Sequence, residues 1–418
     1  MAGEVMLSVQ TNRPAFPTTG SAQLAYVLIE ARPVGAIAQV RMPLNFAFVL
    51  DHSGSMAGAK LSNLKAAAKL AIDRLGPDDL VSVVIFDDKV QVLVPSRPAD
   101  HPSALKREIE NIRDGGGTEM SKGMRAGLDE LRKGLSPGRV SRMLLLTDGE
   151  TFGDADICRK LAAEAGRSGI PIIALGLGED WNEELLDDIA EASRGVSDFI
   201  PDRQPEAILK SFEEHVRTAQ ATAVQNAHLI LRLVPGVLPR AVWRVTPLIA
   251  KLGHRALSDR DVQVTLGDMD VKQGQSVLVE MLLPPRAPGA YRIAQAEITY
   301  DIIALGRVGE KEKVDVVVEF TPDLARASQV NPYVMNIVEK VTAHRLQTQA
   351  LDEAAAGNIA GATQKLRAAA TRLLELGEEE LARTALEEAR RLEEGKGLSP
   401  AGTKKLRYET RKLTQKLD

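Results

Sequence analysis

Between residues 43 and 221, short apolar runs alternate with longer segments whose apolar residues recur every three or four positions. The runs LNFAFVL (44–50) and MLLLT (143–147) are almost uninterrupted, which is typical of strands covered on both faces. Between them lie helical patterns. This alternation predicts a Rossmann-like, doubly wound α/β domain with a parallel or mostly parallel sheet.

The same pattern places the elements of this domain. Strands are predicted at 44–50, 80–86, 90–94, 141–147 and 170–178. Helices are predicted from about 56–60 onward and at about 121–134, 154–168, 182–193 and 204–220.

Two other regions have the pattern of β structure. Residues 4–32 contain two runs of strand formers separated by the turn-forming segment PAFPTTGS. From 222 to 325, short strand patterns alternate with Pro/Gly turns, which predicts a sandwich. The N-terminal strands have no place in a doubly wound sheet. We therefore expect residues 1–42 to join 222–325 in one discontinuous β-sandwich, with the α/β domain of 43–221 inserted.

Residues 326–418 are predicted to be helical throughout. Helices are expected at about 332–355, 358–376, 378–394 and 399–417, with glycines and a proline at the joints. The simplest interpretation is a small helical bundle, although ALDEAAAGNIAGATQKL also resembles a tetratricopeptide-like helix pair. The predicted fold class is thus a multidomain chain of α/β, all-β and all-α parts.

The composition of the chain argues against nucleic-acid binding and against membrane association. The formal net charge of −4 does not favour nucleic-acid binding, and the basic C-terminal tail is better explained by complementary charged helix faces. The single cysteine, Cys158, fits a reducing compartment. No signal peptide and no apolar run of about 20 residues are recognisable. We expect a cytoplasmic protein without a membrane association.

Five oxygen-bearing side chains follow apolar strands or a glycine run on three separate loops. They are Asp51, Ser53, Ser55, Thr118 and Asp148. Oxygen ligands of this kind are those that Mg²⁺ prefers, and Mn²⁺ or Ca²⁺ would also accept them. Ligands in open α/β sheets bind at the carboxyl ends of strands, where these loops are predicted to lie.

The five side chains leave part of a metal's coordination sphere open. Mg²⁺ takes six ligands, so at least one position remains for water or for a carboxylate from a partner protein. Gly54 and the run 115–117 give the two serine- and threonine-bearing loops the freedom to converge. The sequence therefore predicts a metal site that binds a partner.

These residues carry a family resemblance. Asp51-x-Ser53-x-Ser55, Thr118 in GGGT and Asp148 in TDGE resemble the metal-ion-dependent adhesion site of von Willebrand factor A domains, over about residues 43–220. The resemblance implies a divalent ion that binds an acidic residue of a protein partner. Bacterial proteins of this kind often belong to signalling or assembly systems. The flanking β segments also resemble the arrangement in vault-type proteins and inter-alpha-inhibitor heavy chains.

Other functions stay open at this point. A metal-dependent phosphoester hydrolase would use Asp51 as nucleophile, but no general acid and no positioning Lys or Arg is recognisable beside the ligand loops. An accessory subunit of an ATPase or chelatase machine would need a separate ATPase, because the chain has no GxxxxGK[ST]. We therefore expect a protein that is not an enzyme. His52 is expected to face solvent, and Trp181 and Trp243 to pack in the core.

Overall fold

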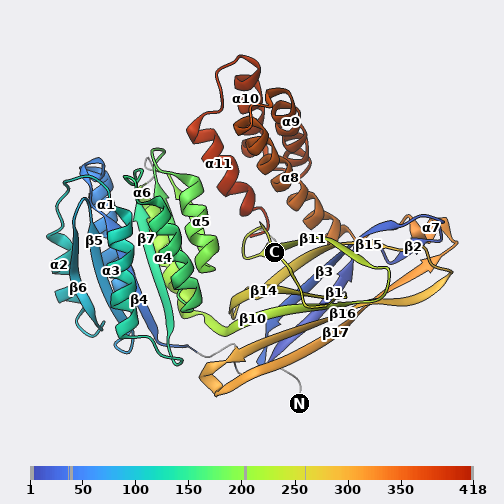
Figure 1. Ribbon diagram of the computed structural model, residues 1–418, viewed down its shortest axis with the longest axis horizontal. Coiled ribbons are helices and arrows are strands. Elements are labelled where there is room, and N and C mark those ends of the chain that lie inside the picture. The colour runs from blue at the N-terminus through green and yellow to red at the C-terminus, as the bar shows by residue number, and fades with distance from the viewer. Residues whose placement is uncertain (1–3, 36, 38–40, 202–204, 259, 416–418) are drawn as a thin grey trace. The chain divides into compact units, whose positions relative to one another are not determined.

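A computed structural model describes residues 4–35, 37, 41–201, 205–258 and 260–415. The chain divides into two compact units. One contains residues 41–222, and the other contains residues 1–40 together with 223–418. Figure 1 shows the elements of both units.

The unit of residues 41–222 has a six-stranded sheet in the order β6-β5-β4-β7-β8-β9. All neighbouring pairs are parallel except β5 with β6. The strands are β4 (Leu44–Asp51), β5 (Leu80–Phe86), β6 (Val90–Pro98), β7 (Val140–Thr147), β8 (Ile172–Leu177) and β9 (Val196–Ile200). Every residue of β4 is buried, as expected for a central strand with helices over both faces.

The helices of this unit form two groups. Helix α1 packs against α2 and α6, whereas α4 packs against α3 and α5. Their bounds are η2 (Gly54–Met56), α1 (Ala59–Asp73), α2 (Pro102–Glu110), α3 (Met120–Lys133), α4 (Ala155–Arg167), α5 (Glu183–Ser193) and α6 (Pro205–Gln220). The chain leaves β4 through α1 to reach β5, while β7 lies on the other side of β4. The strand order therefore reverses at β4, where a ligand crevice is expected.

The second unit contains two antiparallel-rich sheets. One has the order β1-β3-β15-β11-β12 and the other β13-β14-β10-β16-β17-β2. The strands are β1 (Val5–Thr11), β2 (Ala15–Pro17), β3 (Gln23–Pro33), β10 (Thr222–Leu233), β11 (Leu238–Thr246), β12 (Ala250–Lys251), β13 (Arg255–Ala256), β14 (Asp261–Asp270), β15 (Gln275–Leu283), β16 (Gly289–Ile302) and β17 (Arg307–Thr321). A short η3 (Ile303–Leu305) and helix α7 (Leu324–Ala327) complete the β part.

Strands from the start of the chain pair with strands that come after the α/β unit. Antiparallel pairing joins β3 to β15 over nine positions, from Gln275 opposite Ala31 to Leu283 opposite Gln23. In the other sheet β2 pairs with β17 in parallel. This corrects one prediction, because PAFPTTGS contains the strand β2 and is not only a turn. A single hydrophobic cluster, including Val27, Leu231 and Ile298, draws residues from both sheets.

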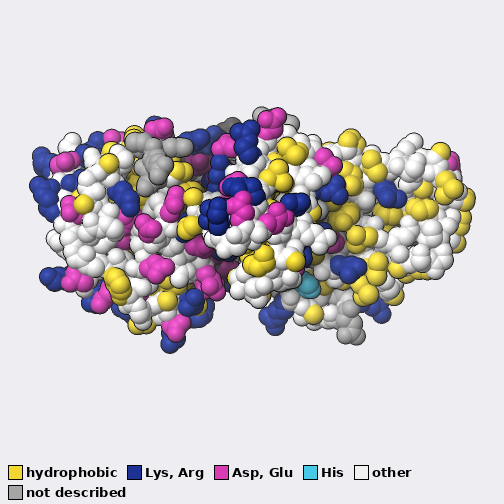
Figure 2. Space-filling view, turned by 90° about the horizontal axis from the view of Figure 1, so that it is seen from above, with side chains coloured by type: hydrophobic (Ala, Val, Ile, Leu, Met, Phe, Trp, Pro, Cys, Tyr) yellow, Lys and Arg dark blue, Asp and Glu magenta, His cyan; other side chains and the backbone are white. Residues whose placement is uncertain are grey.

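Four helices end the chain: α8 (Pro332–Ala355), α9 (Ile359–Glu375), α10 (Glu379–Glu393) and α11 (Pro400–Arg411). The predicted bounds of the first three agree within about two residues, and α11 ends six residues earlier than predicted. Charged side chains of both signs lie together over these helices, as Figure 2 shows. Arg367 with Glu393 and Lys405 with Glu380 are such pairs, in agreement with complementary charged faces.

The terminal helices share a hydrophobic core with one of the sheets. Leu28, Trp243 and Leu278, on three strands, belong to the same cluster as Val334 and Leu366 of α8 and α9. Trp243 also donates a hydrogen bond to Glu280 and meets the His344 ring edge-on. Within the described parts of the chain, every helix is too short or too polar to cross a lipid bilayer.

Candidate metal centre

Register between two central strands brings the first two carboxylates together. Parallel pairing places Leu50 of β4 opposite Leu146 of β7. Asp51 therefore ends β4 beside Thr147, and Asp148 follows one residue later. The Thr147 hydroxyl donates to Asp51 Oδ2 at 2.6 Å. Both carboxylates are fully buried.

Backbone hydrogen bonds connect two of the three predicted loops. Gly115 N donates to His52 O at 2.9 Å, and Gly54 N donates to Gly116 O at 3.2 Å. Gly116 has a φ of 70°, and an added Cβ there would lie 2.5 Å from Asp87 Oδ2. The positive φ and these close side chains strongly favour glycine at this position. Of the three glycines in the run, Gly116 is thus the one that the loop geometry requires.

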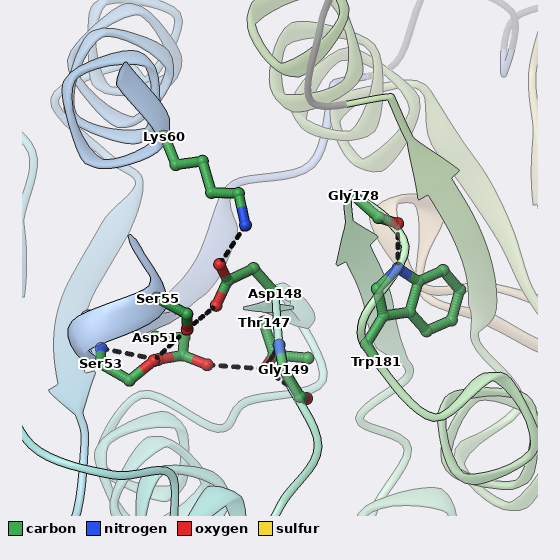
Figure 3. A network of polar contacts seen from close by, with 9 residues as sticks. All are labelled: Asp51, Ser53, Ser55, Lys60, Thr147, Asp148, Gly149, Gly178 and Trp181. Atoms are coloured by element: carbon green, nitrogen blue, oxygen red, sulfur yellow. Dashed lines mark hydrogen bonds and ion pairs between the residues drawn. The ribbon is translucent and has the colours of Figure 1, made fainter. Parts of the chain in front are cut away.

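Ser53, Ser55 and Asp148 form a continuous polar cluster (Figure 3). The Oγ atoms of Ser53 and Ser55 are 3.1 Å apart, and Ser55 Oγ donates to Asp148 Oδ1 at 2.6 Å. Ser53 immediately precedes the short helix η2 and Ser55 lies within it. The spacing of two residues between Ser53 and Ser55 therefore brings their hydroxyls together.

Thr118 lies at the same place. An added Cβ at Gly149 would lie 3.9 Å from Thr118 Oγ1 and 3.8 Å from Ser55 Oγ. Thr118 is 5% exposed. All five predicted side chains are thus brought to one end of the sheet, from β4, the glycine loop and β7.

Asp51 is held in a fixed orientation. Its Oδ1 accepts from Ser53 N at 2.8 Å, and its Oδ2 accepts from Thr147. Burial raises the pKa of Asp51, and the nearby charge of Asp148 raises it further, while hydrogen bonds from Ser53 and Thr147 lower it. Two buried carboxylates close together favour a cation between or beside them.

The oxygen spacing fits a small hard cation. Neighbouring ligands of an octahedral ion at 2.0–2.1 Å lie about 3 Å from each other. The hydrogen-bonded separations of 3.1 Å and 2.6 Å in the Ser53–Ser55–Asp148 cluster lie on either side of that value, so the oxygens could move to an ion with small shifts. Among the described residues, no three His, Cys, Asp or Glu side chains form a metal site. A metal ion at this site would therefore need the hydroxyls of Ser53, Ser55 and Thr118 as ligands.

Lys60 contacts one of the predicted ligands, which the sequence did not lead us to expect. Its Nζ lies 2.6 Å from Asp148 Oδ2, and its side chain is 23% exposed (Figure 3). The expectation that no Lys or Arg lies beside the ligand loops was therefore wrong. A lysine in the first turn of a helix resembles an ordinary surface lysine, so the sequence contained no clear signal.

The structure also shows the surroundings of His52, Trp181 and Cys158. The side chain of His52 is only 15% exposed and its Nδ1 lies 2.7 Å from Arg113 O, so it does not face solvent as expected. Trp181 packs as predicted, 2% exposed, with its Nε1 donating to Gly178 O at 2.7 Å (Figure 3). Cys158 is buried on α4.

Residues 45–213 match the von Willebrand factor type A domain family. The α/β unit is a von Willebrand factor type A domain. Residues 332–416 match the family described as the Sll0103-like, C-terminal alpha-helical domain. The predicted pairing of an A domain with a C-terminal helical domain is therefore confirmed.

Two proteins with similar sequences differ widely in the share of their own length that this chain matches. It is 35% identical over 271 residues to the uncharacterised protein sll0103 of Synechocystis, covering 64% of each chain. It is 31% identical over 197 residues to mouse inter-alpha-trypsin inhibitor heavy chain H2, covering 44% of this chain and 21% of that one. The chain thus spans less than two thirds of these relatives.

Two solved structures share the fold of the whole chain. A von Willebrand factor type A protein from Catenulispora acidiphila has a TM-score of 0.76 at 20% identity, covering 97% of this chain and 96% of that one. The ArnB paralog VWA2 from Sulfolobus acidocaldarius has a TM-score of 0.54 at 16% identity, with 99% of each chain covered.

Proposed function

We propose that Asp51, Ser53, Ser55, Thr118 and Asp148 hold a divalent cation, and that this cation binds an Asp or Glu of a protein partner. Mg²⁺ is the preferred ion, with Mn²⁺ and Ca²⁺ as alternatives. The observation that carries the proposal is the cluster of Ser53, Ser55 and Asp148 oxygens at spacings suited to one small ion. When bound, the ion supplies positive charge for the partner's carboxylate.

The chain's own residues divide this work. In this proposal the hydroxyls of Ser53, Ser55 and Thr118 would contact the ion directly. Both oxygens of Asp51 accept hydrogen bonds, and so do both oxygens of Asp148, so each carboxylate would act on the ion directly or through bound water. In this proposal the protein is a cytoplasmic, non-enzymatic scaffold in bacterial signalling or complex assembly.

A metal titration tests the site before any partner is known. Isothermal titration calorimetry with MgCl2, and electron paramagnetic resonance of bound Mn²⁺, should report one site in the full chain. Thr118→Ala and Ser53→Ala should weaken it at least tenfold, because each removes one oxygen ligand. Ser62→Ala, at an exposed position of α1, is the matched control. Equal binding by all variants would refute the site.

A recovery experiment tests the partner. Proteins of the native host that bind the immobilised chain in Mg²⁺ should be lost in EDTA and with Thr118→Ala. Recovery of the same proteins without metal would refute metal-mediated binding.

Phosphoester hydrolysis is the second candidate, because Lys60 is a cation next to Asp148. Asp51 is poorly suited as a nucleophile, since it is fully buried and both its oxygens accept hydrogen bonds. Phosphoester turnover that Asp51→Asn abolishes would favour this candidate. A role as an accessory subunit of a separate ATPase rests on no observation of the site.

The domain division is also a proposal. Residues 1–42 and 222–325 form one discontinuous sandwich, 43–221 the inserted A domain, and 326–418 a helical domain. The pairing of β3 with β15 supports it. Cooperative unfolding of a chain restricted to 41–222, with metal binding retained, would test it.

A further inference from the structure

Phe152 is exposed next to the proposed metal site. Six of the eight phenylalanines are at most 1% exposed, whereas Phe152 is 73% exposed. Its ring lies against the glycine loop, because an added Cβ at Gly117 would lie 3.6 Å from Phe152 Cε2. Its backbone N donates to Thr118 O at 3.1 Å. The ring therefore borders one of the proposed metal ligands.

Polar contacts hold the Phe152 loop in place. Met120 N donates to Thr151 Oγ1 at 3.0 Å, and Ser121 N donates to Asp154 Oδ2 at 2.7 Å. The Thr151 hydroxyl contacts Asp154, which is 7% exposed. None of these contacts buries the Phe152 side chain. The contacts thus hold the chain on both sides of Phe152, and the ring remains exposed.

An exposed ring at this position has a physical consequence for binding. Single exposed apolar residues are common on protein surfaces and need no explanation by themselves. Phe152 differs because it adjoins a site that already requires a partner's carboxylate. A rigid aromatic side chain loses little conformational freedom on binding, which suits it to anchor a partner.

We propose that Phe152 and the metal site together recognise an acidic residue with an apolar neighbour. The partner's carboxylate binds at the ion and an apolar side chain of the same segment covers the Phe152 ring. The ring contacts Gly117, one residue from Thr118, and an extended chain advances 3.3–3.6 Å per residue. The apolar residue therefore lies within about three positions of the acidic one. This inference rests on the proposed function.

Peptide selection with the full chain tests the specificity. A random fifteen-residue peptide library on phage is selected against the immobilised protein in MgCl2 and in EDTA. We expect Mg²⁺-dependent peptides with Asp or Glu and a large apolar residue within three positions. Phe152→Ala should bind the selected peptides roughly 10- to 30-fold more weakly while it binds Mn²⁺ unchanged. Phe152→Leu should recover most of the affinity.

Leu135→Ala provides the matched control, because Leu135 is 47% exposed and follows the far end of α3. It should bind the peptides like the unaltered chain. Mg²⁺-dependent acidic peptides without an apolar neighbour, or equal binding by Phe152→Ala, would overturn the inference and leave the proposed function standing. Peptide selection that is the same in EDTA, together with absent Mn²⁺ binding, would overturn both.

Discussion

Lys60 Nζ lies 2.6 Å from Asp148 Oδ2, on a carboxylate that is completely buried. The other oxygen of Asp148 accepts from Ser55. Lys60 therefore compensates the charge of a residue that we propose as a metal ligand. A divalent ion at this site would meet an ammonium group that already neutralises one of its ligands.

Replacing Lys60 should have opposite effects on metal binding and on stability. Lys60→Gln should tighten Mg²⁺ binding by about 1 kcal/mol, roughly fivefold, because repulsion between two cations is removed. The metal-free protein should lose about 1–3 kcal/mol of unfolding free energy, since a buried carboxylate loses its charged partner. Calorimetric titration and urea unfolding, each with and without MgCl2, measure the two effects.

Lys69→Gln is the control on the same helix, because Lys69 pairs with the exposed Glu110. Lys69→Gln should change neither the free energy of Mg²⁺ binding nor the free energy of unfolding by more than about 0.5 kcal/mol. Weaker Mg²⁺ binding by Lys60→Gln would contradict the competition and would indicate that Lys60 supports the ion.

The sequence predicted the fold where the pattern is long and regular. Helices α8 to α10 and the strands β4 and β7 follow uninterrupted periodicities, so their positions agree closely. Helix α2 was not predicted, because only Leu105 and Ile109 of its nine residues are buried. Strand β2 was also missed, since three residues next to prolines resemble a turn. Short elements are held by tertiary contacts that a local pattern does not contain.

The five residues of the candidate site were predictable from the topology of the sheet, whereas the contact of Lys60 was not. Asp51, Ser53 and Ser55 are adjacent in sequence, and the ends of neighbouring parallel strands meet at one edge of the sheet. Lys60, by contrast, reaches Asp148 from a helix and not from the end of a strand. That contact depends on where the first turn of α1 points, which neither composition nor periodicity specifies.

Removing the terminal helices should damage the sandwich. A chain ended at residue 330 would expose Leu28, Trp243 and Leu278, which share a core with α8 and α9. We expect a red-shifted tryptophan emission, dye binding to exposed apolar surface and self-association, because burying such side chains is worth about 1.5–3 kcal/mol each. The full chain, folded and in urea, provides the two reference spectra. A monomeric truncated chain with unchanged emission would contradict the shared core.

Cys158 should be unreactive while the protein is folded. Burial raises the pKa of its thiol to about 12. The native state therefore keeps the proton between about pH 9 and 12, where the unfolded chain loses it, so stability should decrease as pH rises through that range. A disulfide reagent at pH 8 should label the native chain far more slowly than the chain in urea. Equally fast labelling of both would refute the assignment of Cys158 to the core.

Glu388 connects two of the terminal helices. It is 2% exposed on α10 and accepts hydrogen bonds from Ser399 N, at 2.7 Å, and from Ser399 Oγ. Ser399 in turn caps α11, since its Oγ accepts from Gly402 N at 3.0 Å. An added Cβ at Gly402 would lie 2.1 Å from Glu388 Oε1, so a larger residue at position 402 would displace the carboxylate.

Glu388→Ala should lower the free energy of unfolding by about 2 kcal/mol, because the substitution leaves the partly buried donors of Ser399 without this acceptor and weakens a helix cap. Glu388→Gln keeps one acceptor and should cost less. Glu387→Ala, at the neighbouring exposed position, should change it by at most about 0.5 kcal/mol. Urea unfolding followed by circular dichroism measures all three. If Glu388→Ala and Glu387→Ala proved equally stable, the carboxylate would not hold α10 and α11 together.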